Sequence, residues 1–417
     1  MKVAVLGGGL TGLTAAYYLA KKNNQVTIFE KSPVLGGLAI GFKQPNWNWH
    51  LEKAYHHLFS NDDDIINFAE EIGFDRIFFE SPETASLFDD LNIYPMDTPI
   101  DFLKLPSLGV FDKLRAGSTL AFLKVSPFLL IFERQTSEQF IKKTMGNIVW
   151  KRLWQELFRK KFGNYAGIIL ASFIWARINK RTKNLGYVEG GFQTFIDYLA
   201  NRLKSLRVNV LTDYEIKNIK KRGEKYLVND RVFDAVVSTL PTPVLSRLTD
   251  DIFPAEFLQK FRKLKYLHAL TLILETKEPV LEKTYWLNVS SPRIPVMAIV
   301  QHTNFIDKKN YGGNHICYLG WYLKREDKLM LMADKDLLSF VRPYLKKLTA
   351  NELQIKNYFT FKGPFAQPIF DKDFVKNKPD FITPAKNFYV ANLDMTYPYD
   401  RGTNYAVKLG KQVAGMI

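Results

Sequence analysis

The stretch Lys2–Glu30, KVAVLGGGLTGLTAAYYLAKKNNQVTIFE, decides the fold that we expect for this chain. Four apolar residues predict a short strand, which breaks into glycines at Gly7, Gly9 and Gly12. A run of good helix formers follows, and a β-branched strand then ends on Glu30. A strand, a G-x-G-x-x-G turn, a helix and a second strand closed by an acid form the dinucleotide-binding fingerprint. The stretch therefore predicts a dinucleotide site, and the alternative is an ordinary βαβ unit without a nucleotide.

Each glycine of this stretch has a role that the fingerprint requires. Gly7 lets the chain turn tightly, Gly9 lets the backbone approach a pyrophosphate, and Gly12 lets the helix pack closely on the strand. The N-terminus of the helix offers free N–H groups and the positive end of its dipole to the phosphates. A carboxylate at the end of the second strand can accept both hydroxyls of a ribose. The first set of predicted cofactor-binding residues is Gly7, Gly9, Leu10, Thr11, Gly12, Glu30 and Lys31.

A second glycine pair, Gly36-Gly37, lies shortly after Glu30. A bound FAD needs backbone close to its diphosphate on this side too, whereas NAD does not. Here the chain resembles the superfamily of FAD-dependent amine oxidases, protoporphyrinogen oxidases and phytoene desaturases, to which UDP-galactopyranose mutase is also related. The oxidase branch usually has Arg directly after the glycine pair, where this chain has Leu38, and the match to the amine oxidases proper is therefore weaker. The resemblance adds Gly36, Gly37 and Leu38 to the expected FAD contacts.

The resemblance also implies an α/β fold, in which a Rossmann-type FAD-binding domain carries an inserted substrate domain of helices and a mostly antiparallel sheet. We expect the FAD-binding domain in three pieces, residues 1–50, 186–260 and 384–417. The substrate domain would comprise residues 51–185 and 261–383, and strands rich in aromatic and β-branched residues after residue 267 would supply its sheet. FAD should be bound non-covalently, because the lone Cys317 is far from the motifs that relatives use for covalent attachment.

Three later positions resemble further FAD-contacting points of the superfamily. In relatives the turn after the strand VNVL lays backbone against the adenine, and Ile216 occupies that place here. The apolar strand Ala235 to Ser238 ends in Thr239-Leu240-Pro241, which resembles a second FAD-contacting loop through Thr239 and Pro241.

The string NFYVANLDMTYPYDRGTNYAVKLGKQVAGM resembles the closing FAD motif of the superfamily. There the last helix points its N-terminus at the flavin pyrimidine oxygen and stabilises the negative charge of the reduced ring. Gly402, Thr403 and Asn404 fall at the start of that helix, and Asp394 and Asp400 are acids near the ribityl chain by position.

Four side chains are candidate catalytic residues through the same resemblance. AYHHLFSNDD is similar to a mutase segment that would bring His56 close to the flavin. Arg177 stands where the mutase has an arginine that meets substrate phosphate, and Tyr397 and Tyr399 precede the last helix and would face the substrate. The alternatives are histidines that only hold the loop and an arginine that is merely structural. No metal site is expected, because no third ligand is suitably spaced beside the histidines.

Two further expectations concern packing. Asn61 and Asp62 are predicted to cap a helix from Asp63 to Ile72 that Gly73 ends. Four residues of the later strands are either core or substrate-pocket residues, namely Trp286, His302, Trp321 and Tyr322.

The net charge of +16 is unevenly spread, because residues 101–188 hold 16 Lys and Arg against five Asp and Glu. Nucleic acid, an anionic membrane or an anionic substrate would explain this charge, and no nucleic-acid motif accompanies it. The run Leu120 to Phe132, LAFLKVSPFLLIF, is too short and broken to span a bilayer. It would either lie in the membrane interface or form a buried core helix. The single cysteine and the nucleotide strand at residue 2 favour the cytoplasm or the cytoplasmic face of a membrane.

We therefore expect a FAD-dependent oxidoreductase of oxidase or desaturase type, which transfers hydride between an organic, lipid-like or lipid-linked substrate and flavin N5. One alternative is a redox-neutral flavoenzyme that resembles UDP-galactopyranose mutase and acts on a sugar nucleotide. Against it, the string from Arg401 to Asn404 departs from the ending of the mutase. The other alternative is a flavin-binding protein without catalysis. The oligomeric state does not follow from the sequence.

Overall fold

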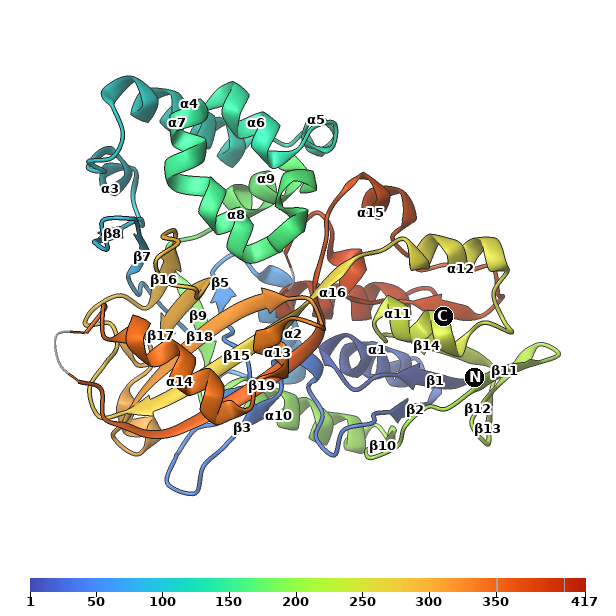
Figure 1. The fold of residues 1–417 in the computed structure, drawn as a ribbon. Helices are drawn as coiled ribbons and strands as arrows, with labels where there is room; N and C mark the ends of the chain where they lie inside the picture. Colours follow the sequence, from blue (N-terminus) through green and yellow to red (C-terminus); the bar gives the residue numbers. More distant parts are fainter. Residues whose placement is uncertain (350–351, 401) are drawn as a thin grey trace.

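The computed structural model of the chain describes residues 1–349, 352–400 and 402–417. Arg401, which opens the string that departs from the mutase ending, lies outside the described residues. Figure 1 shows a layered nucleotide-binding part that holds both marked chain ends, a second sheet beside it, and a block of helices that stands out from both.

The nucleotide-binding part is built on a parallel sheet of β1 (Lys2–Leu6), β2 (Gln25–Phe29), β10 (Asn209–Leu211), β14 (Ala235–Ser238) and β20 (Phe388–Val390). The strand order is β10-β2-β1-β14-β20, and β1 therefore lies in the middle. Because every strand is parallel to its neighbours, the carboxyl ends of the strands meet at one edge. Ligands of open α/β sheets bind at this edge. Gly7, Glu30 and Thr239 each directly follow one of three adjacent strands and so come to it.

Both faces of this sheet are covered. Val3 and Val5 pack with the core of α1 (Leu10–Lys21), α10 (Phe192–Ser205) and α16 (Thr403–Ala414). Ala4 and Leu6 point the other way. Their core includes the antiparallel strands β11 (Ile219–Arg222), β12 (Lys225–Val228) and β13 (Arg231–Phe233), and the helices α11 (Thr242–Leu248) and α12 (Ala255–Arg262). A strand that is buried on both faces needs an unbroken apolar run, which β1 and β14 supply.

The first and last helices of the chain pack directly on each other. A Cβ atom added at Gly410 of α16 would lie 2.5 Å from the carbonyl oxygen of Thr11 and 2.8 Å from Cβ of Thr14 on α1. Only glycine permits this approach, and the two helices that begin at the expected FAD site are therefore fixed to each other.

The predicted helix from Asp63 to Ile72 is confirmed as α2, which Gly73 ends with a φ of +83°. The predicted cap is wrong. Asp62 Oδ2 accepts a hydrogen bond from Phe59 N at 2.9 Å, and Asn61 donates to the carbonyl oxygen of Lys180. The first turn of α2 is capped instead by Asn404 of α16, whose Oδ1 accepts from Ile65 N at 3.0 Å. Although α2 falls within the predicted substrate domain, its apolar side shares the core of α1 and α10.

The second sheet is mostly antiparallel, as expected, and its one parallel pair joins β16 to β7. Its strand order is β19-β15-β18-β17-β16-β7-β8. One face packs on α14 (Asp334–Leu345), and the other turns toward the nucleotide-binding part and the helices. The strands are β7 (Thr84–Leu87), β8 (Ile93–Pro95), β15 (Tyr266–Thr276), β16 (Trp286–Val289), β17 (Ala298–Gln301), β18 (His315–Leu323) and β19 (Ile355–Pro368). A small third sheet joins β5 (Leu58–Phe59), β9 (Leu185–Val188) and β6 (Ile77–Glu80).

The block of helices comprises α3 (Pro99–Leu103), α4 (Val110–Val125), α5 (Leu129–Glu133), α6 (Ser137–Thr144), α7 (Asn147–Val149), a π-helical turn Trp150–Trp154, α8 (Gln155–Phe162) and α9 (Ala171–Lys180). Leu123 and Phe132 are buried in its core, but Val125, Phe128 and Leu130 are 77, 63 and 70% exposed. The run 120–132 is therefore not a buried core helix. Among the described residues, no helix combines the length and the apolar character needed to cross a bilayer.

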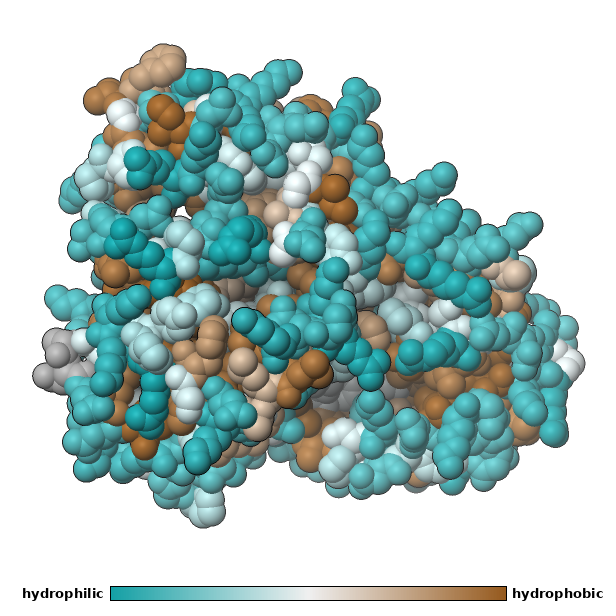
Figure 2. Space-filling model, viewed as in Figure 1, coloured by the Kyte–Doolittle hydropathy of each residue, from teal (hydrophilic) through white to brown (hydrophobic). Residues whose placement is uncertain are grey.

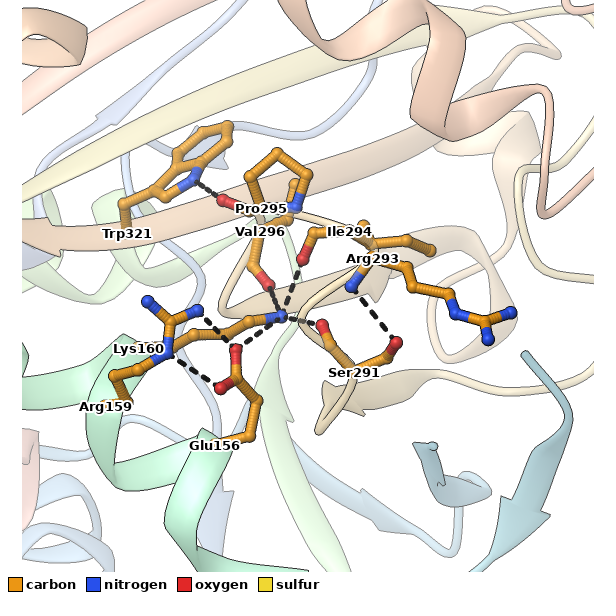
Figure 3. Close-up of polar contacts among 9 residues, drawn as sticks. All are labelled: Glu156, Arg159, Lys160, Ser291, Arg293, Ile294, Pro295, Val296 and Trp321. Atoms are coloured by element: carbon orange, nitrogen blue, oxygen red, sulfur yellow. Dashed lines mark hydrogen bonds and ion pairs between the residues drawn. The ribbon is translucent and has the colours of Figure 1, made fainter. Parts of the chain in front are cut away.

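Lys160 of α8 ties the base of the block to the second sheet (Figure 3). Its Nζ donates to the carbonyl oxygens of Ser291, Ile294 and Val296 at 2.6, 2.6 and 3.1 Å. These carbonyls belong to the loop between β16 and β17, and burial lowers the pKa of Lys160 to about 7. An ammonium group that satisfies three carbonyl oxygens fixes the loop and the helix in one arrangement.

Candidate cofactor-binding and active site

The glycine turn after β1 leaves space at one glycine and none at the other two. Gly7 has a φ of +108°, and a Cβ atom there would lie 2.6 Å from Thr239 Oγ1. A Cβ atom at Gly12 would overlap the carbonyl oxygen of Gly7, so packing alone requires both of these glycines. At Gly9, by contrast, the one described atom that a Cβ would approach within 4 Å is Cα of Gly37, at 3.7 Å. The protein itself does not fill the space beside Gly9, which fits the approach of a diphosphate.

The second glycine pair lies against the first turn. Gly36 N donates to the carbonyl oxygen of Gly8 at 2.9 Å, and Gly36 pairs with Gly9 in a parallel bridge. A Cβ atom at Gly37 would lie 3.1 Å from Cα of Gly9. Both glycines of the pair have positive φ values, +131° and +59°. The two glycine segments therefore run side by side without side chains between them, and both can present backbone to a bound diphosphate. Leu38, which follows the second pair, is 37% exposed.

Glu30 is fixed by backbone N–H groups at the edge of the sheet. Its Oε2 accepts from Gly8 N and its Oε1 from Ser32 N, both at 2.8 Å. The carboxylate therefore links the glycine turn to the segment that contains the exposed Lys31. The loop after β10 runs beside it, because Tyr214 N donates to the carbonyl oxygen of Glu30 at 2.9 Å. This contact brings Ile216, the expected adenine neighbour, to the same end of the sheet.

The start of α16 presents polar atoms without partners among the described residues. Its N-cap is Gly402, and among the described residues no side chain caps it. The Thr403 hydroxyl is buried and has no hydrogen-bond partner there, whereas Asn404 is engaged with α2. Helix α1 likewise begins after Gly9 without a side-chain cap among the described residues, so the N–H groups near Leu10 and Thr11 can receive an anion. An orphaned buried hydroxyl and two uncapped helix starts fit a bound FAD.

The loop after β14 supports the glycine turn from the side. Thr239 Oγ1 donates to the carbonyl oxygen of Leu6 at 2.8 Å, and Pro241 is the N-cap residue directly before α11. Asp394 is buried next to this loop, where its Oδ2 accepts from Thr242 Oγ1 at 2.5 Å and from Tyr266 Oη at 2.6 Å. Burial raises the pKa of Asp394 to about 6, while these two hydrogen bonds lower it. Its Oδ1 is a second buried oxygen without a partner among the described residues.

Among the candidate catalytic residues, His56 lies beside Phe192 at the start of α10, with ring centroids 5.9 Å apart. Its Nδ1 is 2.6 Å from the carbonyl oxygen of Ala54 and, because a carbonyl oxygen only accepts, must carry the proton. Its neighbour His57 is half-buried, and desolvation, followed by the charges of His56, Arg181 and Arg177, lowers its pKa to about 3. His57 Nδ1 lies 3.3 Å from Tyr285 Oη.

Arg177, Tyr397 and Tyr399 meet where the last segment of the chain crosses the helical block. Arg177 Nη1 donates to Asp400 Oδ2 at 2.7 Å, and Lys161 Nζ lies 2.9 Å from the same oxygen. The Tyr399 ring stacks on Tyr405 with centroids 5.0 Å apart. Asp400, which we expected near the ribityl chain, thus holds two cations of the block.

The hydroxyl of Tyr397 is committed to the helical block. It lies 2.8 Å from Glu133 Oε1 and 2.9 Å from Ser172 Oγ, and its ring packs on Phe370. These contacts make Tyr397 an anchor of the closing segment, and its role at the substrate stays a prediction.

The four aromatic and histidine residues of the second sheet divide into two groups. His302 is 2% exposed and bonds Tyr311 Oη through Nε2 at 2.8 Å, and Trp321 donates to the carbonyl oxygen of Pro295 at 2.6 Å. Both are core residues. Trp286 and Tyr322 lie at the junction with the helical block, where Trp286 packs edge-on against Tyr55 at 4.8 Å.

Glu52, a buried carboxyl group beside this region, was not recognised by reasoning from sequence. Its Oε2 accepts from Tyr187 Oη at 2.6 Å, its Oε1 from Phe192 N at 2.7 Å, and its carbonyl oxygen from Tyr318 Oη at 2.9 Å. Burial raises the pKa of Glu52 to about 7, and the hydrogen bonds from Tyr187 and Phe192 oppose the rise. No cluster of three or more metal-ligating side chains occurs in the part of the chain that the structure describes.

Comparison with known proteins agrees with this geometry. The profile of the family "Flavin containing amine oxidoreductase" matches residues 10–417. The 15-cis-phytoene desaturase of Synechococcus elongatus is 22% identical over 465 aligned positions, which cover 100% of this chain and 96% of that protein.

Two solved structures have the same fold. An oxidoreductase from Methanosarcina mazei has a TM-score of 0.76 at 18% identity and covers 100% of both chains. Reduced UDP-galactopyranose mutase has a TM-score of 0.75 at 16% identity and covers 100% of this chain and 94% of its own. At such identities these likenesses bear on the fold alone, whereas the family profile spans nearly the whole chain. The chain therefore belongs to the flavin containing amine oxidoreductase family and is a FAD-dependent oxidoreductase.

Proposed function

We propose that this enzyme is of the oxidase or desaturase type and transfers hydride from a C–H bond of a lipid-like or lipid-linked organic substrate to flavin N5, with one proton released as the new double bond of the product forms. The observation that carries the proposal is that two candidate catalytic side chains are bound to other residues of the protein. Arg177 is paired with Asp400, and Tyr397 is bound to Glu133 and Ser172. FAD supplies the redox chemistry when it is bound, and the protein then needs to orient the substrate and exclude water.

The surroundings of the proposed substrate site suit an apolar molecule. Trp286, Tyr322 and Tyr399 lie where the second sheet meets the apolar core of the helical block. Aromatic side chains offer large apolar surfaces with a polar edge, which favours a long hydrocarbon over a sugar nucleotide. The desaturase relative that aligns along its whole length is named for a hydrocarbon, and that supports the same class of substrate.

The expected FAD contacts and domain boundaries are part of this proposal. Gly9, Gly37, Glu30 and Thr403 would hold FAD, and the substrate would meet it at the junction of sheet and helices. We also propose that the enzyme works in the cytoplasm, at the inner face of a membrane, because its single cysteine, Cys317, is buried and unpaired and suits a reducing compartment.

The test is the absorbance of the protein-bound flavin while NADPH is added without oxygen. We expect an oxidised flavin that NADPH does not bleach, and bleaching by long-chain isoprenoid or amine substrates in a subsequent screen. Turnover should then reduce one molecule of acceptor, such as oxygen or a quinone, for each product formed. Rapid bleaching by NADPH, or product without acceptor consumption, would contradict the proposal and favour a reductase or a mutase-like reaction. Free FAD serves as the control.

A further inference from the structure

The solvent-exposed face of α4 carries apolar side chains, although such a face normally carries polar ones. Phe111, Leu114 and Val125 on this face are 71, 64 and 77% exposed, while Ala116 and Leu123 on the opposite face are buried. A helix on a protein surface normally turns polar residues to water. With a rise of 1.5 Å per residue, the 16 residues of α4 present an apolar strip about 24 Å long.

The strip continues onto the helix that follows. Phe122 of α4 lies 6.1 Å, centroid to centroid, from Phe132 of α5. Next to it the chain exposes Phe128, Leu130 and Ile131, at 63, 70 and 46%. On the face shown in Figure 2, hydrophobic residues reach the surface at the outer end of the block, among hydrophilic ones. We call this surface the α4–α5 strip, and it consists of Phe111, Leu114, Phe122, Val125, Phe128, Leu130 and Ile131.

Positive charge accompanies the strip. The guanidinium group of Arg115 lies 5.9 Å from the centroid of the Phe111 ring and also donates to the carbonyl oxygens of Lys143 and Thr144, at the end of α6. This contact brings the exposed Lys142 and Lys143 of α6 beside α4. Residues 101–188 as a whole carry 11 of the 16 net positive charges of the chain.

We propose that the α4–α5 strip docks on the surface of an anionic lipid bilayer, with its apolar side chains in the acyl boundary and the neighbouring lysines and Arg115 at the headgroups. Apolar side chains beside basic ones are what a helix lying in the membrane interface requires. A second copy of the chain is a poorer occupant, because pairing this face with itself would bring two strongly positive blocks together. The inference rests on the proposed function only in explaining why the enzyme would dock, because a lipid-like substrate would be found in the bilayer.

The position of the strip suits a flat partner. It lies at the free end of the block that stands out from both sheets (Figure 1), while Lys160 holds the base of the block to the second sheet (Figure 3). A bilayer could therefore reach the strip without touching the nucleotide-binding part. The π-helical turn and α8 would connect the docked end to the junction with the sheet.

The experiment is flotation of the FAD-loaded full chain with vesicles of equal parts phosphatidylcholine and phosphatidylglycerol, and with vesicles of phosphatidylcholine alone. We expect the protein to float with the anionic vesicles and to dissociate as salt is raised. The variant Leu114→Gln/Val125→Gln should lose at least about tenfold in partition coefficient, because two inserted apolar side chains become polar. The matched control Leu331→Gln changes a similarly exposed leucine, at 72%, on the short helix Lys328–Leu331 outside the helical block, and should float like the unchanged protein.

Flavin content and the unfolding midpoint of each variant show whether it is folded and loaded. Equal flotation of the double variant and the unchanged protein, or no flotation at all, would overturn the inference. Sedimentation that reveals a dimer lost in the double variant, or binding only to an acidic protein, would overturn it in favour of that partner. Flotation needs no turnover, so its failure and the failure of the proposed reaction are separate results.

Discussion

Asn404 Oδ1 accepts a hydrogen bond from Ile65 N at 3.0 Å, across 339 residues of chain. This one bond caps the first turn of α2 and fixes the start of α16, at which the flavin is expected. The Asn404 side chain is 5% exposed, so no water replaces the bond when it is lost.

Asn404→Ala should lower the free energy of unfolding by about 1–2 kcal/mol, because a helix cap and a buried hydrogen bond are removed together. We also expect weaker FAD retention, since the start of α16 loses its contact with α2. Denaturant unfolding and flavin content after dialysis measure the two effects. Asn218→Ala, at an exposed position, is the matched control, and equal stabilities of the two variants would refute the role of the cap.

Gly9→Val should separate folding from cofactor binding. The one described atom within 4 Å of a Cβ atom at Gly9 is Cα of Gly37, at 3.7 Å, and the Gly9 backbone is extended. The apoprotein should therefore keep its stability to within about 1 kcal/mol, while yellow colour is lost. Gly12→Ala is the contrasting variant, because its Cβ would overlap the carbonyl oxygen of Gly7 and destabilise the apoprotein itself. A fully flavinylated Gly9→Val protein would show that the diphosphate lies elsewhere.

Glu52 should make stability fall as pH rises. Its pKa is about 7 in the folded protein against 4.5 in the unfolded chain, so the folded state holds the proton more tightly. The stability that this proton contributes is fully present below the unfolded pKa and is lost as pH rises through the folded pKa. Between about pH 5 and about pH 8 the loss amounts to roughly 2–3 kcal/mol.

Glu52→Gln should remove that part of the pH dependence, as urea unfolding across this range would show. Asp62 and Asp394, whose pKa values burial raises to about 6, act in the same direction, so the slope decreases without vanishing. The exposed Glu256→Gln is the control and should leave the slope unchanged. Identical slopes for Glu52→Gln and the unchanged protein would mean that Glu52 is ionised throughout.

Tyr397→Phe should act on stability and not on the flavin. Without the hydroxyl, Glu133 Oε1 and Ser172 Oγ each lose a partner, and we expect a loss of about 1–3 kcal/mol. Tyr399→Phe keeps the ring that stacks on Tyr405 and should change stability by less than about 0.5 kcal/mol. Thermal unfolding and the rate of flavin reduction distinguish the two positions. A slower reduction with unchanged stability in Tyr397→Phe would place its hydroxyl at the substrate.

The parts of this molecule that were predictable from sequence are those fixed by local rules. The order of strand, glycines, helix and acid needs no distant contact, and β1, α1 and β2 follow it. The bounds of β14 match the predicted strand Ala235 to Ser238, because a strand buried on both faces must be apolar throughout. The capping of α2 was beyond this reasoning, since nearby Asp62 satisfies the usual pattern and the actual partner is 339 residues away.

The candidate site shows the same division. The spacing of glycines in the G-x-G-x-x-G turn indicates which positions need glycine, and Gly7 and Gly12 could therefore be recognised from sequence. The engagement of Tyr397 with Glu133 was not, because it depends on how the closing segment crosses a helical block of unrelated sequence. Glu52 looked like any acid in a loop, and its raised pKa follows from burial that only the assembled fold reveals.

The packing of α1 on α16 at Gly410 determines when the site can be completed during synthesis of the protein. The glycine turn at residues 7–12, where we expect the diphosphate, precedes α16, where we expect the flavin, by almost four hundred residues of chain. Domains fold as they emerge from the ribosome, and this one waits for its last helix with its central sheet still lacking β20. We therefore expect FAD to be held fully only once α16 has been synthesised, and the supply of FAD in the cell then bears on how many chains reach the stable state.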